Sequence, residues 1–251
     1  MFTANSCLGK LALDKKVSYP LLGELDQHIS LSGNAGSATF NHPSALCYAP
    51  HLEAVLVVEG NGRYISKINL QDDLFCQAFI PEDIAPRVNS MVNPYASIGL
   101  MSICAMPDRV CWSNSSVNKV LDYHKGSIRS IGNGKRGYAM ASFEEYSSLD
   151  GPSGLAFYDK AIMISEKNNH CVRSFAGSSK LVAGHPVSSE YANFYPEKLL
   201  FTKEGLFLID GKKISQMLNN KITIVYDENS LVLNMVAAWP KHIIILEGKD
   251  A

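Results

Sequence analysis

Long apolar runs and long runs of like charge are both missing from this chain of 251 residues. No stretch reaches the roughly 20 apolar residues of a membrane-spanning helix, and the start, MFTANSCLGKLALDKK, holds no apolar run of signal-peptide length. The 23 basic and 24 acidic residues leave a formal net charge of -1, which disfavours a general nucleic-acid partner. We therefore expect a soluble, cytoplasmic protein without a membrane partner.

Motifs of common catalytic and metal sites are also missing. The seven histidines show no H-x-x-x-H or H-E-x-x-H spacing, which is the usual sign of a zinc site on a helix. No G-x-S-x-G nucleophile motif occurs, and GNGKRG at 132–137 lacks the G-x-x-x-x-G-K-[ST] pattern of a phosphate loop. The sequence predicts no catalytic residue, no metal site and no cofactor, and it favours a protein that is not an enzyme.

Paired C-x-x-C motifs are absent among the cysteines as well. Most of the cysteines lie in apolar, strand-like runs such as LMSICAM at 100–106, where a free thiol behaves as a small hydrophobe. Their even number leaves disulfides open, but their dispersion is not that of a disulfide scaffold. We expect a reducing compartment. The six cysteines are Cys7, Cys47, Cys76, Cys104, Cys111 and Cys171.

Repetition is what the sequence does contain, in strand-like rather than helical patterns. HPSALCYAPHLEAVLVVEGNGRYISKI at 42–68 and GPSGLAFYDKAIMISEKNNHCVRSF at 151–175 share a Pro-Ser start, two apolar strands, a turn of equal length and an alternating third strand. More degenerate copies begin at Gly99, Pro196 and Leu231. A polar residue, here called the marker residue, ends the second strand of each copy. The marker residues are Glu59, Asn114, Glu166, Asp210 and Glu247.

Repeats of this size with about four strands each are typical of β-propeller blades. The last copy holds only two strands, and CLGKLAL at 7–13 with VSYPLLG at 17–23 supplies the missing pair. We expect 7–22 to pair with the strand around 243–246, because closing the ring removes exposed strand edges. The sequence predicts one all-β domain over 1–251, a five-bladed β-propeller of four-stranded blades. A six-bladed ring would need an inner strand before Cys7, for which MFTANS is a poor candidate, and a β-sandwich of similar hairpins is a further alternative.

Two of the copies resemble NHL repeats. FNHPSAL followed by VVEGNGRYISKI, and LDGPSGLAF followed by MISEKNNHCVRSFAG, are similar to that family's Pro-x-Gly strand and V-A-D-x-x-N-H-R-I-R hairpin. The closest match is KNNHCVR at 167–173. The resemblance implies a β-propeller fold. It also implies relatives that are metal-dependent lyases or lactonases, and others that bind RNA.

The loops that lead into the first strand of each blade, here called lead-in loops, are the candidate binding surface. In a propeller they meet at one end of the channel, where amide, imidazole, phenol and carboxylate groups suit recognition with aromatic anchors. These residue types are equally typical of plain turns. The candidate binding residues are His42, Asn93, Tyr95, Asp150, Tyr195 and Glu197.

A non-catalytic propeller that binds or scaffolds a partner is the function that these features favour. We expect a protein partner, with a small-molecule ligand as an alternative. One alternative is a metal-dependent lyase or lactonase. The other is an RNA-binding NHL domain, for which only the stretch 124–137 is locally basic.

Overall fold

The computed structural model describes residues 2–4, 7–12, 17–23, 29–70, 74–92, 101–186, 194–202, 205–210, 213–218, 221–227, 232–239 and 242–248. The chain divides into two compact units, Met1–Ser130 and Ile131–Ala251. The prediction of one domain over the whole chain stays a prediction.

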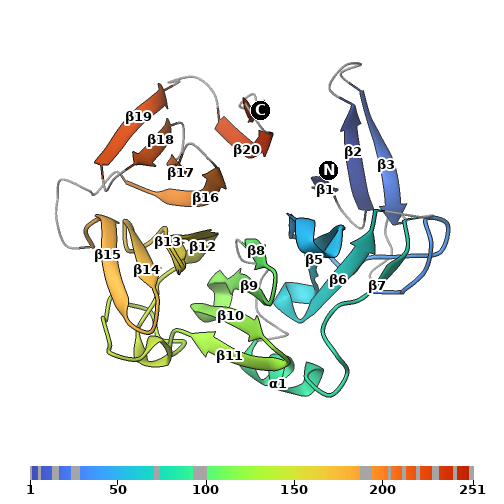
Figure 1. Cartoon of the computed structure of the whole chain (residues 1–251), viewed down its shortest axis with the longest axis horizontal. Helices are drawn as coiled ribbons and strands as arrows, with labels where there is room; N and C mark the ends of the chain where they lie inside the picture. The colour runs from blue at the N-terminus through green and yellow to red at the C-terminus, as the bar shows by residue number, and fades with distance from the viewer. Residues whose placement is uncertain are drawn as a thin grey trace. The chain divides into compact units, whose positions relative to one another are not determined.

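Antiparallel sheets make up the described structure, and α1 (Ala85–Met91) is the only α-helix within it. Four of the sheets have four strands each, in chain order (Figure 1). The all-β class and the four-stranded repeats are therefore confirmed. The first sheet comprises β4 (Ala45–Ala49), β5 (Ala54–Glu59), β6 (Tyr64–Asn69) and β7 (Cys76–Ala78), and the second β8 (Ile103–Met106), β9 (Arg109–Asn114), β10 (Lys119–His124) and β11 (Ser127–Ile131). The third comprises β12 (Pro152–Tyr158), β13 (Ala161–Glu166), β14 (Cys171–Phe175) and β15 (Ser179–Gly184), and the fourth β16 (Pro196–Thr202), β17 (Gly205–Asp210), β18 (Lys213–Leu218) and β19 (Lys221–Asp227).

The second strand of each repeat is the most buried one. In β5, AVLVVE, and in β13, AIMISE, every residue is buried, since these strands are covered on both faces, where Val and Ile pack well. The hairpin between β12 and β13 turns at Asp159 and Lys160, which both have positive φ, 47° and 63°. Two such residues form the turn that matches the twist of paired strands.

Neighbouring sheets within a unit pack face to face. In the first unit, Leu56 and Val58 of β5 share a core with Trp112 of β9, and the Trp112 indole nitrogen donates to the Gly62 carbonyl oxygen at 2.8 Å. In the second unit, β12 approaches β16 so closely that a Cβ atom added to Gly154 would lie 2.7 Å from the Leu199 nitrogen. The sheets are thus positioned by side-chain packing between their faces.

The N-terminal strands correct one expectation. β2 (Cys7–Ala12) and β3 (Val17–Gly23) form where the sequence predicts them, but their sheet begins with β1 (Phe2–Ala4), and Thr3 of β1 pairs with Leu8. The start MFTANS does therefore supply an inner strand. Phe and Thr favour strands, and three residues suffice to pair with the beginning of β2.

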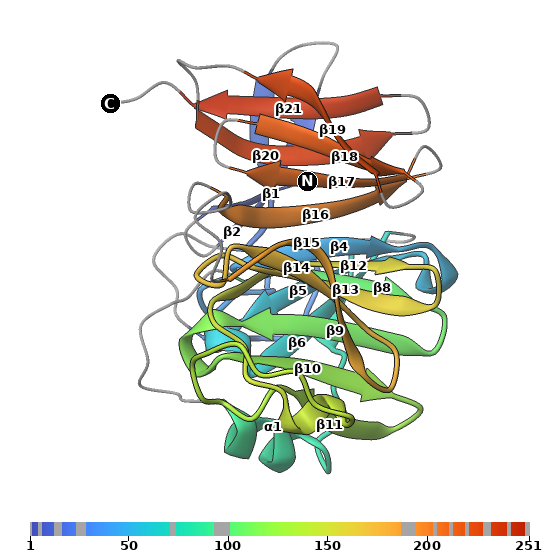
Figure 2. The ribbon, with the colours of Figure 1, turned by 90° about the vertical axis from the view of Figure 1, so that its left-hand side faces the viewer.

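The C-terminal hairpin corrects a second expectation. β20 (Val232–Trp239) and β21 (His242–Gly248) form a two-stranded sheet, in which 243–246 pair with 235–238 and not with 7–22. β20 contacts β16 of the fourth sheet (Figure 2). The described strands form four four-stranded sheets rather than five, together with a three-stranded and a two-stranded sheet. The five-blade count with its shared last blade is not what the structure shows.

Candidate functional site

The marker residues anchor the lead-in loops. In the first, third and fourth sheets, the marker side chain accepts a hydrogen bond from a backbone N–H of the lead-in loop. The three bonds run from Asn41 to Glu59 (2.7 Å), from Asp150 to Glu166 (3.1 Å) and from Tyr195 to Asp210 (2.6 Å). The recurring acids therefore have a structural role, because each one fixes the backbone just before a first strand.

Asn114, the marker of the second sheet, acts differently. Its Oδ1 accepts from the Ser116 backbone nitrogen and hydroxyl, which caps the turn Ser115–Val117. Its Nδ2 donates to the Asn61 carbonyl oxygen at 2.7 Å. The second sheet is thereby tied to the turn Gly60–Gly62 of the first sheet. The side chain of Glu247, the last marker, lies outside the described residues.

Three of the predicted binding residues gather in the second unit. Asp150, Tyr195 and Glu197 each contact the turn 167–170 between β13 and β14. The Asn168 amide donates to the Asp150 carboxylate at 2.9 Å, and the Lys167 ammonium pairs with Glu197 at 2.5 Å. We call these residues the lead-in cluster: Asp150, Lys167, Asn168, His170, Tyr195 and Glu197.

An aromatic pair, exposed Tyr195 and half-buried His170, forms the centre of the lead-in cluster. The rings of Tyr195 and His170 meet edge to face with centroids 4.9 Å apart, and Tyr195 keeps 41% of its surface exposed. His170 Nδ1 donates to the Phe194 carbonyl oxygen at 2.9 Å, which fixes the imidazole ring. The cluster thus presents a phenol and an imidazole beside two carboxylates and one ammonium group.

The other predicted residues belong to the first unit. His42 is an exposed residue of the first unit with a φ of 50°, and its Nδ1 lies 2.8 Å from Asn41 Oδ1. Asn93 and Tyr95 fall in 93–100, outside the described residues. In the sequence, Lys167, Asn168 and His170 are recognisable only as part of a repeat, although their turn lies at the same end of the sheet as the lead-in loop.

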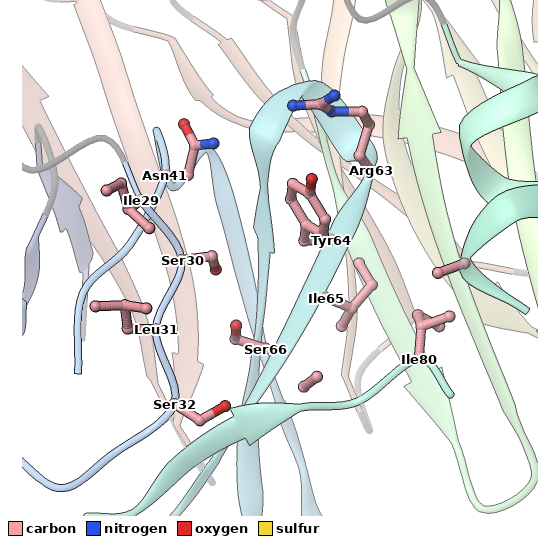
Figure 3. Close-up of a pocket in the computed structure, with 12 residues that line it drawn as sticks. Ile29, Ser30, Leu31, Ser32, Asn41, Arg63, Tyr64, Ile65, Ser66 and Ile80 are labelled. Carbon is pink, nitrogen blue, oxygen red and sulfur yellow. The ribbon is translucent and has the colours of Figure 1, made fainter. Parts of the chain in front are cut away.

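A pocket of about 330 Å³ opens in the first unit (Figure 3). Residues 29–32 and 63–66 line it from two segments, together with Asn41, Ala78, Ile80 and Ala85. The Ser30 and Ser66 hydroxyls both donate to the buried carboxylate of Glu59 behind this lining. The Arg63 guanidinium lies over the Tyr64 ring, 5.1 Å from its centroid. Sequence reasoning missed the pocket, because the two segments that line it lie about thirty residues apart.

Burial affects the protonation of Glu59. Desolvation raises the pKa of this carboxyl, and the hydrogen bonds from Ser66, Asn41 and Ser30 offset only part of that rise. In the described part of the chain, Glu59 has these three donors and no ion-pair partner. The pocket therefore stands next to a buried acid that lacks a cation.

The described residues contain no group of three or more His, Cys, Asp or Glu side chains placed to hold a metal ion. All six cysteines are free thiols.

In the locally basic stretch 124–137, His124 and Lys125 contact Asp108, and Arg129 pairs with Asp122. Aspartate side chains thus pair with part of the positive charge of this stretch. No described helix is long and apolar enough to cross a membrane.

No protein-family profile matches the sequence, and no curated protein does. The resemblance to NHL repeats therefore stays a prediction. Solved structures do match. A chain of the nidogen/laminin complex covers 97% of this chain and 82% of its own length, with a TM-score of 0.62 at 12% identity. Virginiamycin B lyase from Staphylococcus aureus covers 79% of this chain and 60% of its own length, with a TM-score of 0.51 at 15% identity.

A further match is the extracellular domain of a hybrid two-component system from B. thetaiotaomicron. It covers 93% of this chain and 29% of its own chain, with a TM-score of 0.51 at 12% identity. At these identities the likeness shows the fold alone, and the first two proteins are β-propellers. The chain is therefore an all-β propeller protein built of four-stranded blades.

Proposed function

We propose that this protein is a non-catalytic binding propeller that recognises a protein partner through its lead-in loops. The observation that carries the proposal is Tyr195, an aromatic side chain that is 41% exposed although its backbone and ring are both held in place. Exposed Tyr residues on rigid elements are typical anchors of protein interfaces.

The anchor is held before any partner arrives. The Tyr195 backbone nitrogen donates to Asp210, Pro196 follows at the start of β16, and the ring leans on His170. A side chain that is ordered in advance loses little conformational entropy on binding. The cluster can therefore contribute affinity without rearrangement of the loop.

Charges beside the anchor supply specificity. Lys167 and Glu197 form an ion pair that stays about one-third exposed at each end. Exposed pairs of this kind contribute little to folding, but at the rim of an interface they select complementary partners and steer association. A chain of the nidogen/laminin complex shares the propeller fold, which is consistent with protein recognition on this scaffold.

Paired tyrosine and phenylalanine variants test the proposal. Tyr195→Ala removes the anchor just before β16, while Phe201→Ala removes an exposed aromatic near the other end of β16, where it packs on Tyr158. The partner is first recovered from native extract with the wild-type protein and with Phe201→Ala as baits. We expect this partner to bind Tyr195→Ala about thirtyfold more weakly than it binds the wild type, because an anchor contributes about 2 kcal/mol. Equal affinity of the two variants, measured by calorimetry at unchanged melting temperature, would remove the lead-in cluster from the interface.

Charge reversal gives an independent check. Lys167→Glu and Glu197→Lys each place two like charges together, whereas the double variant restores the pair with its ends exchanged. If the rim contacts the partner, the double variant folds like the wild type yet associates more slowly. Wild-type association by the double variant would show that the partner does not touch this pair.

The enzymatic alternative makes a different prediction. A metal-dependent lyase or lactonase must retain a metal ion, so elemental analysis of the purified protein separates the two functions. Stoichiometric metal that is lost together with a substrate-dependent activity would favour the enzyme over the binding propeller.

A further inference from the structure

The first and third sheets carry the same buried acid in the same register. Glu59 ends β5 and Glu166 ends β13, and the residue two positions before each acid pairs with the third strand: Val57 with Ser66, and Ile164 with Arg173. Ser66 and Arg173 are therefore equivalent positions, seven residues after their acids.

The segments before the two sheets are equivalent as well. An isolated bridge joins Leu31 to Thr39 before the first sheet, and another joins Ala139 to Ser148 before the third. In both segments, the residue two positions after the second bridge residue donates its backbone N–H to the buried acid. These donors are Asn41, which donates to Glu59, and Asp150, which donates to Glu166. Ser30 directly precedes the bridge residue Leu31, and Tyr138 directly precedes the bridge residue Ala139, so Ser30 corresponds to Tyr138.

In the third sheet these two positions hold large side chains that close the space beside the acid. Arg173 is fully buried and donates to both carboxylate oxygens of Glu166. Its Nη1 donates to the Ala139 carbonyl oxygen (3.1 Å), and its Nη2, which also donates to Glu166, donates to the Ser148 carbonyl oxygen (2.6 Å). The Tyr138 ring lies against the guanidinium, with its centroid 4.9 Å from the central carbon.

In the first sheet two serines stand in their place, and the pocket occupies that space. Each serine hydroxyl gives its hydrogen to Glu59, so the oxygen lone pairs of Ser30 and Ser66 remain as acceptors at the pocket lining. Such a site fits a group that only donates hydrogen bonds and carries positive charge. A guanidinium group has five N–H donors and no acceptor.

We propose that the pocket of the first unit binds a guanidinium group, which pairs with Glu59 through Ser30 and Ser66 as Arg173 pairs with Glu166 in the third sheet. The volume of about 330 Å³ accommodates an arginine-sized ligand. Leu31, Ile65 and Ile80 offer apolar surface for an aliphatic stem (Figure 3).

The guanidinium can come from free arginine or from an arginine side chain of a partner. Arg63, at the pocket, suits the carboxylate of free arginine, whereas a peptide would offer no such group. Calorimetric titration with arginine, with citrulline as its uncharged isostere, and with an arginine peptide blocked at both ends separates these sources. Tighter binding of arginine than of the peptide points to the free molecule, and the reverse points to a partner side chain.

Three variants make the test specific. Glu59→Gln removes the charge, Ser66→Arg supplies the guanidinium from within the chain, and Ser127→Arg adds an arginine at an exposed position of β11 as a control. We expect arginine to bind at least tenfold more tightly than citrulline. Glu59→Gln should abolish that preference, Ser66→Arg should abolish binding, and Ser127→Arg should leave both unchanged.

Several outcomes would overturn the proposal. They are the absence of binding by either arginine ligand at millimolar concentration, equal affinity for arginine and citrulline, and unchanged arginine affinity in a folded Ser66→Arg variant. Should Glu59→Gln fail to fold, Ser66→Arg still decides. The result is independent of the lead-in cluster, because Tyr195→Ala should bind arginine like the wild type.

Discussion

At the scale of single residues, the buried acids differ in what compensates their charge. Glu59 has hydroxyl and amide donors, Glu166 has a guanidinium, and Asp122 of β10 has two, from Arg109 and Arg129. An acid without a cation resists ionisation, and an acid with two favours it. The pKa of Glu59 is raised and that of Asp122 is lowered, so these two positions should respond to pH in opposite directions.

Glu59 should make the protein less stable as the pH rises. Burial raises its pKa above the ordinary value of 4.5, so the native chain holds more protons than the unfolded chain above that value. The stabilisation is complete below pH 4.5 and is lost as the pH rises through the higher native value. Glu59→Gln should flatten this dependence, and the melting temperature of wild type relative to the variant should fall as the pH rises above 4.5. A constant difference over that range would contradict the prediction.

Asp122 should behave in the opposite way. Burial alone would raise its pKa, but hydrogen bonds from Arg109 and Arg129 outweigh burial and lower it. The stabilisation is present above the ordinary value of 3.8 and is lost as the pH falls through the lower native value. Asp122→Asn should cost about 3 kcal/mol of unfolding free energy at neutral pH, measured by urea denaturation.

Asp108→Asn is the matched control for that substitution. Asp108 is exposed and contacts His124 and Lys125 at 3.4 Å, so its loss should leave stability nearly unchanged. An equal loss of unfolding free energy in Asp122→Asn and Asp108→Asn would show that the buried position of Asp122 adds no stability.

At the scale of strands and sheets, close packing between neighbouring strands limits which substitutions the fold tolerates. Gly154 of β12 lies against the backbone of β16, where an added Cβ would be 2.7 Å from the Leu199 nitrogen and 2.8 Å from the Lys198 Cα. Gly154→Ala must push the two strands apart and should cost about 1–3 kcal/mol. Gly36→Ala, where the nearest atom would be 3.8 Å away, is the control. Equal unfolding midpoints in urea would refute a close approach of β12 and β16.

The strands themselves could be predicted from the sequence, and the contacts between distant segments could not. Runs such as AVLVVE and AIMISE, each closed by an acid and a turn, indicate buried strands without further information. The bond from Ser30 to Glu59 spans 29 residues, and the Tyr195–His170 pair joins two sheets. Such contacts depend on the path of a loop, which local patterns do not encode. β1 was missed for a related reason, since three residues show no periodicity.

At the scale of the whole chain, the N-terminal strands belong to a core and are not an appendage. Leu8 of β2 and Leu22 of β3 are fully or almost fully buried, in one cluster with Phe40 and Val57. Leu8→Ala should therefore cost about 3 kcal/mol, while Leu181→Ala, at a partly exposed position in β15, should cost much less.

The same variant tests whether the chain is one domain. If the two units unfold together, Leu8→Ala should shift the whole calorimetric transition to lower temperature. A shift confined to one part of the transition would show that Met1–Ser130 and Ile131–Ala251 unfold independently.

The equivalence of Ser66 and Arg173 makes the third sheet an engineering target. Arg173→Ser with Tyr138→Ser would turn its filled interior into an artificial receptor beside Glu166, at the cost of a buried ion pair. Methylguanidinium added at low concentration should then restore the melting temperature of this double variant by chemical rescue, since a ligand that binds only the folded state stabilises it. Methylammonium, which cannot form the planar fork, should rescue it less. In a repeat fold, the template for such a receptor is already present in another copy of the repeat.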